Sequence, residues 1–237
     1  MRKLSDDLKF EYLLDSAVLL EVGGRKILVD GLPGDGNAFD RLSPELEEAI
    51  MAGQGDFAGL NGLFFTHCHD DHFDSGKLAT YLERNPGSFV VVPGDADEDP
   101  CFFVPTGEKG ELRHGPDTAG PDFEYMKTEH LTYDCPEHYA YNFLSGGTNV
   151  IVTGDMDLVK LGMLKGFTMR EHSFIFVNNV LLWHKRWCDM VEAMGFEKVF
   201  IYHVPSAEND SEGYRERAAE LWPVNGQGRH GWEVLNL

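Results

Sequence analysis

The sequence has no long apolar run. No stretch approaches the roughly 20 apolar residues that a membrane-spanning helix needs. The first residues, Met1 to Asp7, are not followed by an apolar core of signal-peptide length. We therefore expect a chain that neither crosses a membrane nor carries a secretory leader.

Cysteine is scarce, and its spacing forms no pattern. Cys68, Cys101, Cys135 and Cys188 contain no C-x-x-C pair. This spacing gives no sign of a disulfide framework or a thiolate zinc site, and it predicts a reduced, cytoplasmic protein. Cys68 is expected to be a buried structural thiol.

Positive charge is also scarce, with 20 Lys and Arg against 40 Asp and Glu and a formal net charge of −20. Nucleic-acid affinity depends on basic side chains that neutralise phosphates, so we expect no nucleic-acid partner. The composition, 42% hydrophobic and 25% charged, is typical of a globular protein. A length of 237 residues predicts one domain over residues 1–237.

Two common catalytic motifs are absent as well. The chain contains neither the G-x-S-x-G motif of serine hydrolases nor the G-x-x-x-x-G-K-[ST] phosphate-binding loop. Covalent catalysis by a serine elbow and phosphate binding by a P-loop are therefore not expected.

Histidine and aspartate are instead concentrated in one short segment. The apolar residues Leu63 to Phe65 lead directly into Thr66-His67-Cys68-His69-Asp70-Asp71-His72. Imidazole and carboxylate groups are the usual ligands of zinc and similar divalent ions. A buried strand that ends in this loop predicts a metal site.

Two later apolar strands end in the same kinds of residue. Val150 to Thr153 is followed by Gly154 and Asp155, and Val199 to Tyr202 is followed by His203. Two isolated histidines, His130 and His138, precede Asp155, and either could add a further ligand. His130 ends an alternating segment, as a strand-end ligand should, whereas His138 lies only three residues before the strand at Tyr141. We favour His130; the other histidine would orient a ligand or contact substrate.

This ordered set of residues resembles the metallo-β-lactamase superfamily, and the spacing after His130 is similar to that of its lactonase-like members. The resemblance covers about Leu19 to His203. It implies a four-layer αββα sandwich of two mixed β-sheets with helices on the outer faces. It further implies two divalent metal ions, one held by His67, His69 and His130, the other by Asp71, His72 and His203, with Asp155 between them.

A metal pair would supply the missing nucleophile, because a cation lowers the pKa of bound water and makes hydroxide available near neutral pH. Asp71, or Asp70 beside it, can assist proton transfer, although Asp70 fits a structural role as well. Zinc suits a His and carboxylate set best, with iron or manganese as alternatives. The expected function is hydrolysis of a small ester, lactone or phosphodiester. The alternatives are a mononuclear iron dioxygenase of the persulfide dioxygenase type and a non-catalytic metal-binding protein.

Propensity and capping signals predict the remaining elements. Strands are expected at 17–22, 26–29, 89–92, 123–128, 139–144, 149–153 and 173–177, and helices at 43–51, 77–84, 182–194 and 212–221. The segment 93–121 reads as a long loop. Its apolar residues Cys101 to Val104 predict either a lid over the site or an anchor to the core.

Overall fold

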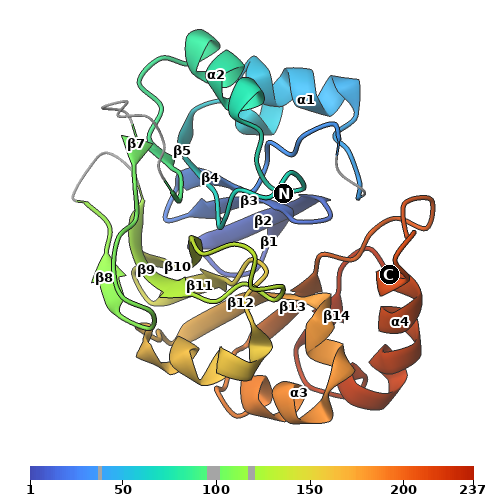
Figure 1. The fold of residues 1–237 in the computed structure, drawn as a ribbon. Helices are drawn as coiled ribbons and strands as arrows, with labels where there is room; N and C mark the ends of the chain where they lie inside the picture. The colour runs from blue at the N-terminus through green and yellow to red at the C-terminus, as the bar shows by residue number, and fades with distance from the viewer. Residues whose placement is uncertain (37–38, 95–101, 117–120) are drawn as a thin grey trace.

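Two β-sheets stack face to face, and helices cover both outer faces (Figure 1). The structure is a computed structural model that describes residues 1–36, 39–94, 102–116 and 121–237. From top to bottom in Figure 1 the layers are a helical layer, one sheet, the other sheet and a second helical layer. The predicted αββα sandwich of two mixed sheets is confirmed.

The first sheet is built from the amino-terminal half of the chain. Its strands, in spatial order, are β1 (Arg2–Lys3), β2 (Leu8–Leu14), β3 (Ala17–Val22), β4 (Arg25–Val29), β5 (Leu60–Phe64), β6 (Val90–Val91) and β7 (Phe102–Phe103). Strands β1 to β4 pair antiparallel, and β4 to β7 pair parallel. The turn between β3 and β4 requires glycine, because Gly23 has a φ of +58° and a Cβ there would lie 2.2 Å from Ser145 Oγ.

The second sheet repeats this pattern with the carboxyl-terminal half. Strands β8 to β11 pair antiparallel, and β11 to β14 pair parallel. The strands are β8 (Leu112–His114), β9 (Asp122–Thr128), β10 (His138–Ser145), β11 (Thr148–Val152), β12 (His172–Asn178), β13 (Lys198–Tyr202) and β14 (Trp232–Val234). The parallel strands of each sheet therefore present their carboxyl ends at one edge.

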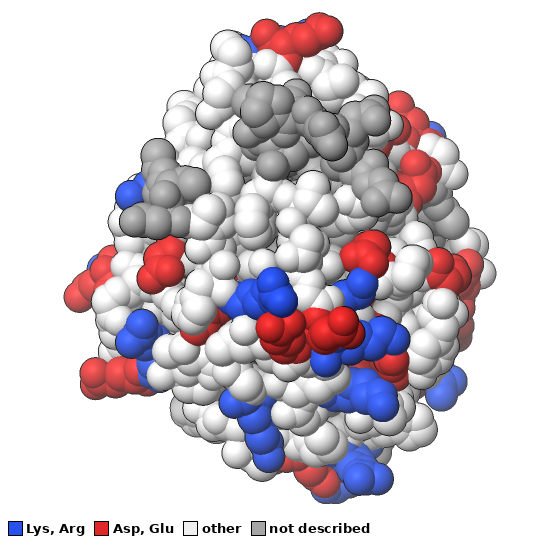
Figure 2. Space-filling view, turned by 60° about the vertical axis from the view of Figure 1, so that its left-hand side comes forward, with Lys and Arg blue, Asp and Glu red and all other residues white. Residues whose placement is uncertain are grey.

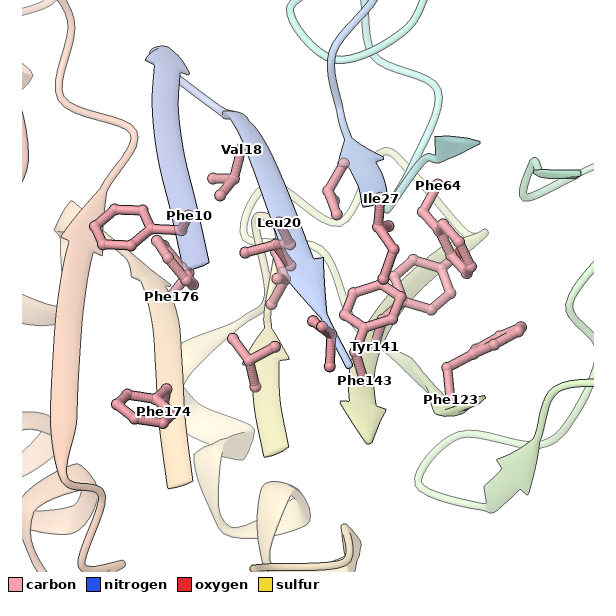
Figure 3. Packing of buried hydrophobic residues seen from close by; sticks show 14 of the residues in the cluster. Phe10, Val18, Leu20, Ile27, Phe64, Phe123, Tyr141, Phe143, Phe174 and Phe176 are labelled. Carbon is pink, nitrogen blue, oxygen red and sulfur yellow. The ribbon is translucent and has the colours of Figure 1, made fainter. Parts of the chain in front are cut away.

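Aromatic side chains from both sheets fill the space between them (Figure 3). Phe64 of β5 contacts Phe123 and Phe143 of the opposite sheet edge-on, with ring centroids 4.9 Å apart in both pairs. Burial of one such ring contributes about 1.5–3 kcal/mol, and edge-on pairs add to this. Both sheets thus share one core, although the single-domain assignment stays a prediction.

Four helices form the outer layers: α1 (Pro44–Met51), α2 (Ser75–Arg84), α3 (Lys185–Glu192) and α4 (Tyr214–Leu221). As predicted, Ser43 caps α1 by accepting a hydrogen bond from the Leu46 N–H at 3.2 Å. Further helical segments are the 3₁₀ helices η1 (Gly55–Phe57), η2 (Leu158–Gly166) and η3 (Asn179–Trp183) and the π-helical η4 (Trp222–Gly226).

The predicted helix at 182–194 is wrong at its start, because η3 is a separate 3₁₀ turn and α3 begins only at Lys185. The Asn178 side chain starts η3 by accepting from the Val180 N–H at 3.0 Å. The predicted helix at 212–221 begins two residues later, at Tyr214, because Gly213 has a left-handed backbone with a φ of 75°.

The long segment 93–121 contains the short strands β7 and β8. Cys101 of the apolar segment lies outside the described residues, but Phe103 packs its ring on Phe123 and Tyr125 at centroid distances of 6.1 and 5.5 Å. These contacts favour the interpretation that Phe103 anchors the segment to the core, and not that it forms a lid over the site.

The outer surface carries paired charges. Figure 2 shows basic and acidic side chains lying next to one another on one face. Lys109–Glu129, Arg113–Glu111 and Lys127–Glu137 form ion pairs on β8, β9 and their loops. No helix in the described ranges combines the length and apolar composition needed to cross a bilayer.

Candidate metal centre

Strand ends from both sheets meet at one edge of the sandwich. The loop after β5 carries residues 66–72, while His130, Asp155 and His203 follow β9, β11 and β13. Backbone hydrogen bonds fix this meeting point. Thr66 O accepts from the Tyr139 N–H at 2.9 Å, and Asp155 O accepts from the Leu131 N–H at 2.9 Å. The His203 N–H donates to Asp15 O at 2.8 Å. Residues far apart in sequence are therefore held at fixed positions.

Four of the predicted ligands form one group, which we name group B: Asp71, His72, Asp155 and His203. His72 Nε2 lies 3.2 Å from His203 Nε2 and 3.5 Å from Asp71 Oδ2. His203 Nε2 lies 3.3 Å from one oxygen of each carboxylate. Ligands about 2.0–2.2 Å from a tetrahedral zinc ion are about 3.3–3.6 Å apart. The spacing in group B fits such an ion.

Two further carboxylates determine which nitrogen of each imidazole faces into group B. His72 Nδ1 lies 3.0 Å from Asp30 Oδ2, and His203 Nδ1 lies 3.2 Å from Asp15 Oδ2. With the proton on Nδ1, each Nε2 presents a lone pair toward the same point as Asp71 and Asp155. In this tautomer four acceptors converge, and each Nδ1 proton lies beside a carboxylate. A cation satisfies this arrangement.

The electrostatics agree with this interpretation. Burial opposes charge on His72 and His203, but the neighbouring carboxylates outweigh it and hold both pKa values well above the usual range. Burial likewise opposes charge on Asp155, yet His203 and His72 hold its pKa well below the usual range. Group B therefore attracts positive charge, whether as protons or as a metal ion.

The other predicted ligands form group A: His67, His69 and His130. The Nε2 atoms of His67 and His130 are buried without a hydrogen-bond partner. Burial lowers the pKa of both residues, so their imidazoles are neutral and can act as ligands. Buried polar atoms are normally satisfied. Two orphan nitrogens beside His69 therefore fit a second cation.

Asp155 lies between the two groups. Its Oδ1 accepts a hydrogen bond from Asn178 Nδ2 at 2.7 Å. Its Oδ2 lies 3.9 Å from His130 Nε2 of group A and 3.3 Å from His203 Nε2 of group B. This position fits the bridging role that the sequence predicts, although the ligand role of all seven residues stays a prediction.

YhfI of Bacillus subtilis, described as a metallo-β-lactamase fold protein, matches this arrangement of elements. It aligns with 92% of this chain and 87% of its own, with a TM-score of 0.50 and 16% sequence identity. The chain has the metallo-β-lactamase fold. No family model matches the sequence.

Two other solved structures share this metallo-β-lactamase fold at low identity. Igni18, a metallo hydrolase of Ignicoccus hospitalis, has a TM-score of 0.57 and 16% identity over 96% of this chain and 94% of its own. CmlA, a diiron β-hydroxylase of Streptomyces venezuelae, has a TM-score of 0.56 and 14% identity over 100% of this chain and 54% of its own. These likenesses concern the fold alone.

One sequence relative is a UPF0173 metal-dependent hydrolase of Aeropyrum pernix. It is 38% identical over 85 residues, which are 35% of this chain. The match spans only 29% of the relative's own length.

Three carboxylates around the ligands were not identified from the sequence. Besides Asp15 and Asp30, Asp134 Oδ1 lies 3.5 Å from His69 Nε2 and 3.4 Å from His130 Nδ1. Asp30 also accepts from the Thr66 N–H and hydroxyl at 2.7 and 2.8 Å. Asp30 alone gave a signal, because it follows the apolar strand β4, but its glycine-rich surroundings suggested only a turn.

Backbone conformation contributes to the site at Gly154. Its φ is +55°, and a Cβ there would lie 2.6 Å from Thr66 Oγ1 and 2.8 Å from His138 Nε2. Only glycine allows β11 to approach the histidine loop this closely. This explains the glycine before Asp155.

Two residues of the histidine loop lie outside both groups. Asp70 is exposed and its side chain packs beside Gly34, which supports its structural interpretation. Cys68 is exposed, with Sγ 3.2 Å from Pro93 O. The prediction of a buried thiol is therefore wrong, because the turn directs Cys68 away from the groups and toward the surface.

His138 belongs to neither group. It is fully buried, its Nδ1 lies 2.6 Å from Thr128 Oγ1, and burial lowers its pKa to about 3. Its ring centroid is 5.1 Å from that of His67. His138 Nε2 is also buried without a partner, but only His130 groups with His67 and His69. We therefore keep His130 as the predicted ligand and assign His138 to the packing around group A.

Replacing His130 with Ala should lower metal content by about one equivalent per chain, since it removes a ligand and opens the coordination sphere. His138→Ala should leave metal content nearly unchanged. Elemental analysis of both variants after loading with zinc, with circular dichroism to confirm folding, measures the difference. Loss of metal from the His138 variant alone would reverse the assignment.

Proposed function

We propose that the protein is a dinuclear metal-dependent hydrolase that acts on a small ester, lactone or phosphodiester. The observation that carries this proposal is the convergence of Asp71, His72, Asp155 and His203, with a buried carboxylate beside the Nδ1 of each imidazole. Group A lies beside it, with His130 Nε2 3.9 Å from Asp155 Oδ2. Two complete groups favour this function over the mononuclear dioxygenase and non-catalytic alternatives.

The donor set of imidazoles and carboxylates without thiolate fits zinc, and also iron or manganese. Bound cations supply Lewis acidity and lower the pKa of coordinated water toward neutrality. The chain's own contribution is to fix the imidazoles: Asp15 and Asp30 hold His203 and His72 in one orientation.

Asp71 is the proposed catalytic residue. Its Oδ2 faces His72 Nε2 and His203 Nε2, yet 13% of its side chain is exposed. The carboxylate can therefore hold a cation and also exchange a proton with substrate. His72 and His203 hold the Asp71 pKa below its usual range despite burial, so this carboxylate is ionised and can hold a cation.

Small substrates suit the surroundings of the site. The cavity beside Asp155 and His203 has a volume of about 60 Å³, which has room for a few non-hydrogen atoms. Basic side chains such as Lys109, Arg113 and Lys127 already pair with glutamates, so nucleic acid is not expected as a partner. A cytoplasmic location stays a prediction.

The test is a panel of esters, lactones, phosphodiesters and structured RNAs, assayed with zinc-, iron- and manganese-loaded protein. We expect turnover of at least one small-molecule class that a chelator abolishes and added metal restores. Metal-dependent cleavage of RNA much faster than any small-molecule turnover would contradict the proposal. The Asp155→Asn variant tests whether the metal-dependent turnover belongs to this site.

A further inference from the structure

The cavity beside group B has an apolar wall and two polar groups without partners. Phe39, Leu131 and Val180 form the wall, and Asn179 and Tyr214 also line the cavity. The Phe39 ring lies 5.3 Å from that of His203, nearly perpendicular to it. This is the space in which the part of the substrate next to the reacting group would lie.

Asn179 presents an unused acceptor there. Its side chain is buried, with 1% of the residue exposed, and its Nδ2 donates to His203 O. Its Oδ1 is buried without a hydrogen-bond partner. An orphan acceptor in the interior costs about 1–3 kcal/mol. A ligand with an N–H or O–H group would satisfy it.

Tyr214 presents an unused donor in the same cavity. Its ring stacks on Trp183 at a centroid distance of 6.0 Å and also contacts Phe39. No hydrogen bond of its hydroxyl is found among the described residues. Burial and the nearby carboxylates raise the Tyr214 pKa, so the hydroxyl keeps its proton and can donate to a ligand oxygen.

Apart from the residues of groups A and B, the described lining of the cavity carries no charged side chain, and it contains no Lys or Arg. An anionic substituent that lies away from groups A and B would lose hydration there without gaining a Lys or Arg partner. An uncharged substituent fits better.

We propose that this cavity selects uncharged substrates that carry a hydrogen-bond donor next to the scissile group, with Asn179 Oδ1 accepting from that N–H or O–H and the Tyr214 hydroxyl donating to a neighbouring oxygen. The inference rests on the proposed hydrolase function and names its substrate class. Asn179 and Tyr214 thereby become specificity-determining residues.

The experiment compares three matched phenyl esters: of N-acetylglycine, of its N-methyl counterpart N-acetylsarcosine, and of monoanionic succinate. Metal-loaded wild type should hydrolyse the N–H ester with a kcat/KM about tenfold or more above that of the N-methyl ester, since the latter leaves Asn179 Oδ1 unpaired. The anionic ester should be the poorest of the three. Equal values for the N–H and N-methyl esters, or preference for the anion, would overturn the inference.

Variants assign the effect to the cavity. Tyr214→Phe keeps the ring packing and should raise KM for the N-acetylglycine ester about tenfold while metal content is unchanged. Tyr133→Phe is the matched control, because its exposed hydroxyl donates to Asp157 outside the cavity. The inference fails if Tyr214→Phe behaves as the control does. Asn179 is not substituted, because its Nδ2 also donates to His203 O. Its role is tested by comparing the N–H and N-methyl esters in the wild type.

Binding separates this inference from the proposed function. The unreactive amides N-acetylglycine methylamide and N-acetylsarcosine methylamide are titrated calorimetrically into metal-loaded protein. Tighter binding of the N–H compound supports the cavity assignment, whether or not any ester is hydrolysed. Absence of ester hydrolysis would count against the proposed hydrolase function only. Equal binding of both amides contradicts the cavity assignment.

Discussion

Asp155→Asn should lower the hydrolytic rate on the order of 1,000-fold and remove about one metal equivalent per chain. The substitution preserves shape and can still accept from Asn178, so the loss comes from the negative charge. Asp155 Oδ2 lies toward both His130 and His203. The neutral amide cannot balance two cations in this buried position.

Kinetics on the best substrate of the panel, together with elemental analysis, measure both effects. Asp70→Asn is the matched control, since Asp70 is an exposed carboxylate of the histidine loop outside both groups. It should retain metal and activity. Full metal content and a wild-type rate in the Asp155 variant would show that Asp155 takes no part in metal binding or catalysis.

Asp30→Ala should lower the free energy of unfolding of the metal-free protein by about 3–5 kcal/mol, as expected for removal of one partner from a buried charged pair. Asp30 is fully buried. It contacts the Thr66 N–H, the Thr66 hydroxyl and His72 Nδ1. All three lose their partner in the variant. Water cannot take the place of the Asp30 carboxylate unless the surrounding residues rearrange.

Urea unfolding followed by circular dichroism, in the presence of chelator, gives this difference. Asp35→Ala is the control, because Asp35 is exposed and pairs with Lys77 at the surface. It should unfold close to wild type. If Asp30→Ala also unfolds close to wild type, Asp30 does not hold the histidine loop in place.

The residues that meet at the candidate metal centre could be predicted from sequence because each stands at the end of an apolar strand or within one short loop. Their grouping rested on the resemblance to the metallo-β-lactamase superfamily, and the parallel strands do bring His67, Asp155 and His203 to one edge. Asp15 and Asp134 could not be predicted in the same way. His203, the partner of Asp15, comes from a segment distant in sequence. Asp134 lies four residues after His130, but it also lies beside His69 of the distant histidine loop.

The helix boundaries show a similar limit. The periodic pattern of apolar residues continues from Leu182 into α3, but it does not distinguish a buried 3₁₀ turn from a first helical turn. The Asn178 side chain, which also donates to Asp155, starts η3 at Asn179, and α3 begins separately after its N-cap residue His184.

The number of metal ions bound per chain tests the central claim most directly. Protein purified without added metal, and the same protein loaded with zinc and freed of excess, are analysed for all transition metals. The two groups predict about two equivalents per chain after loading, with proton release on binding. Less than about one equivalent of any transition metal after loading would contradict the account, and one tightly bound iron without a second ion would favour the oxygenase.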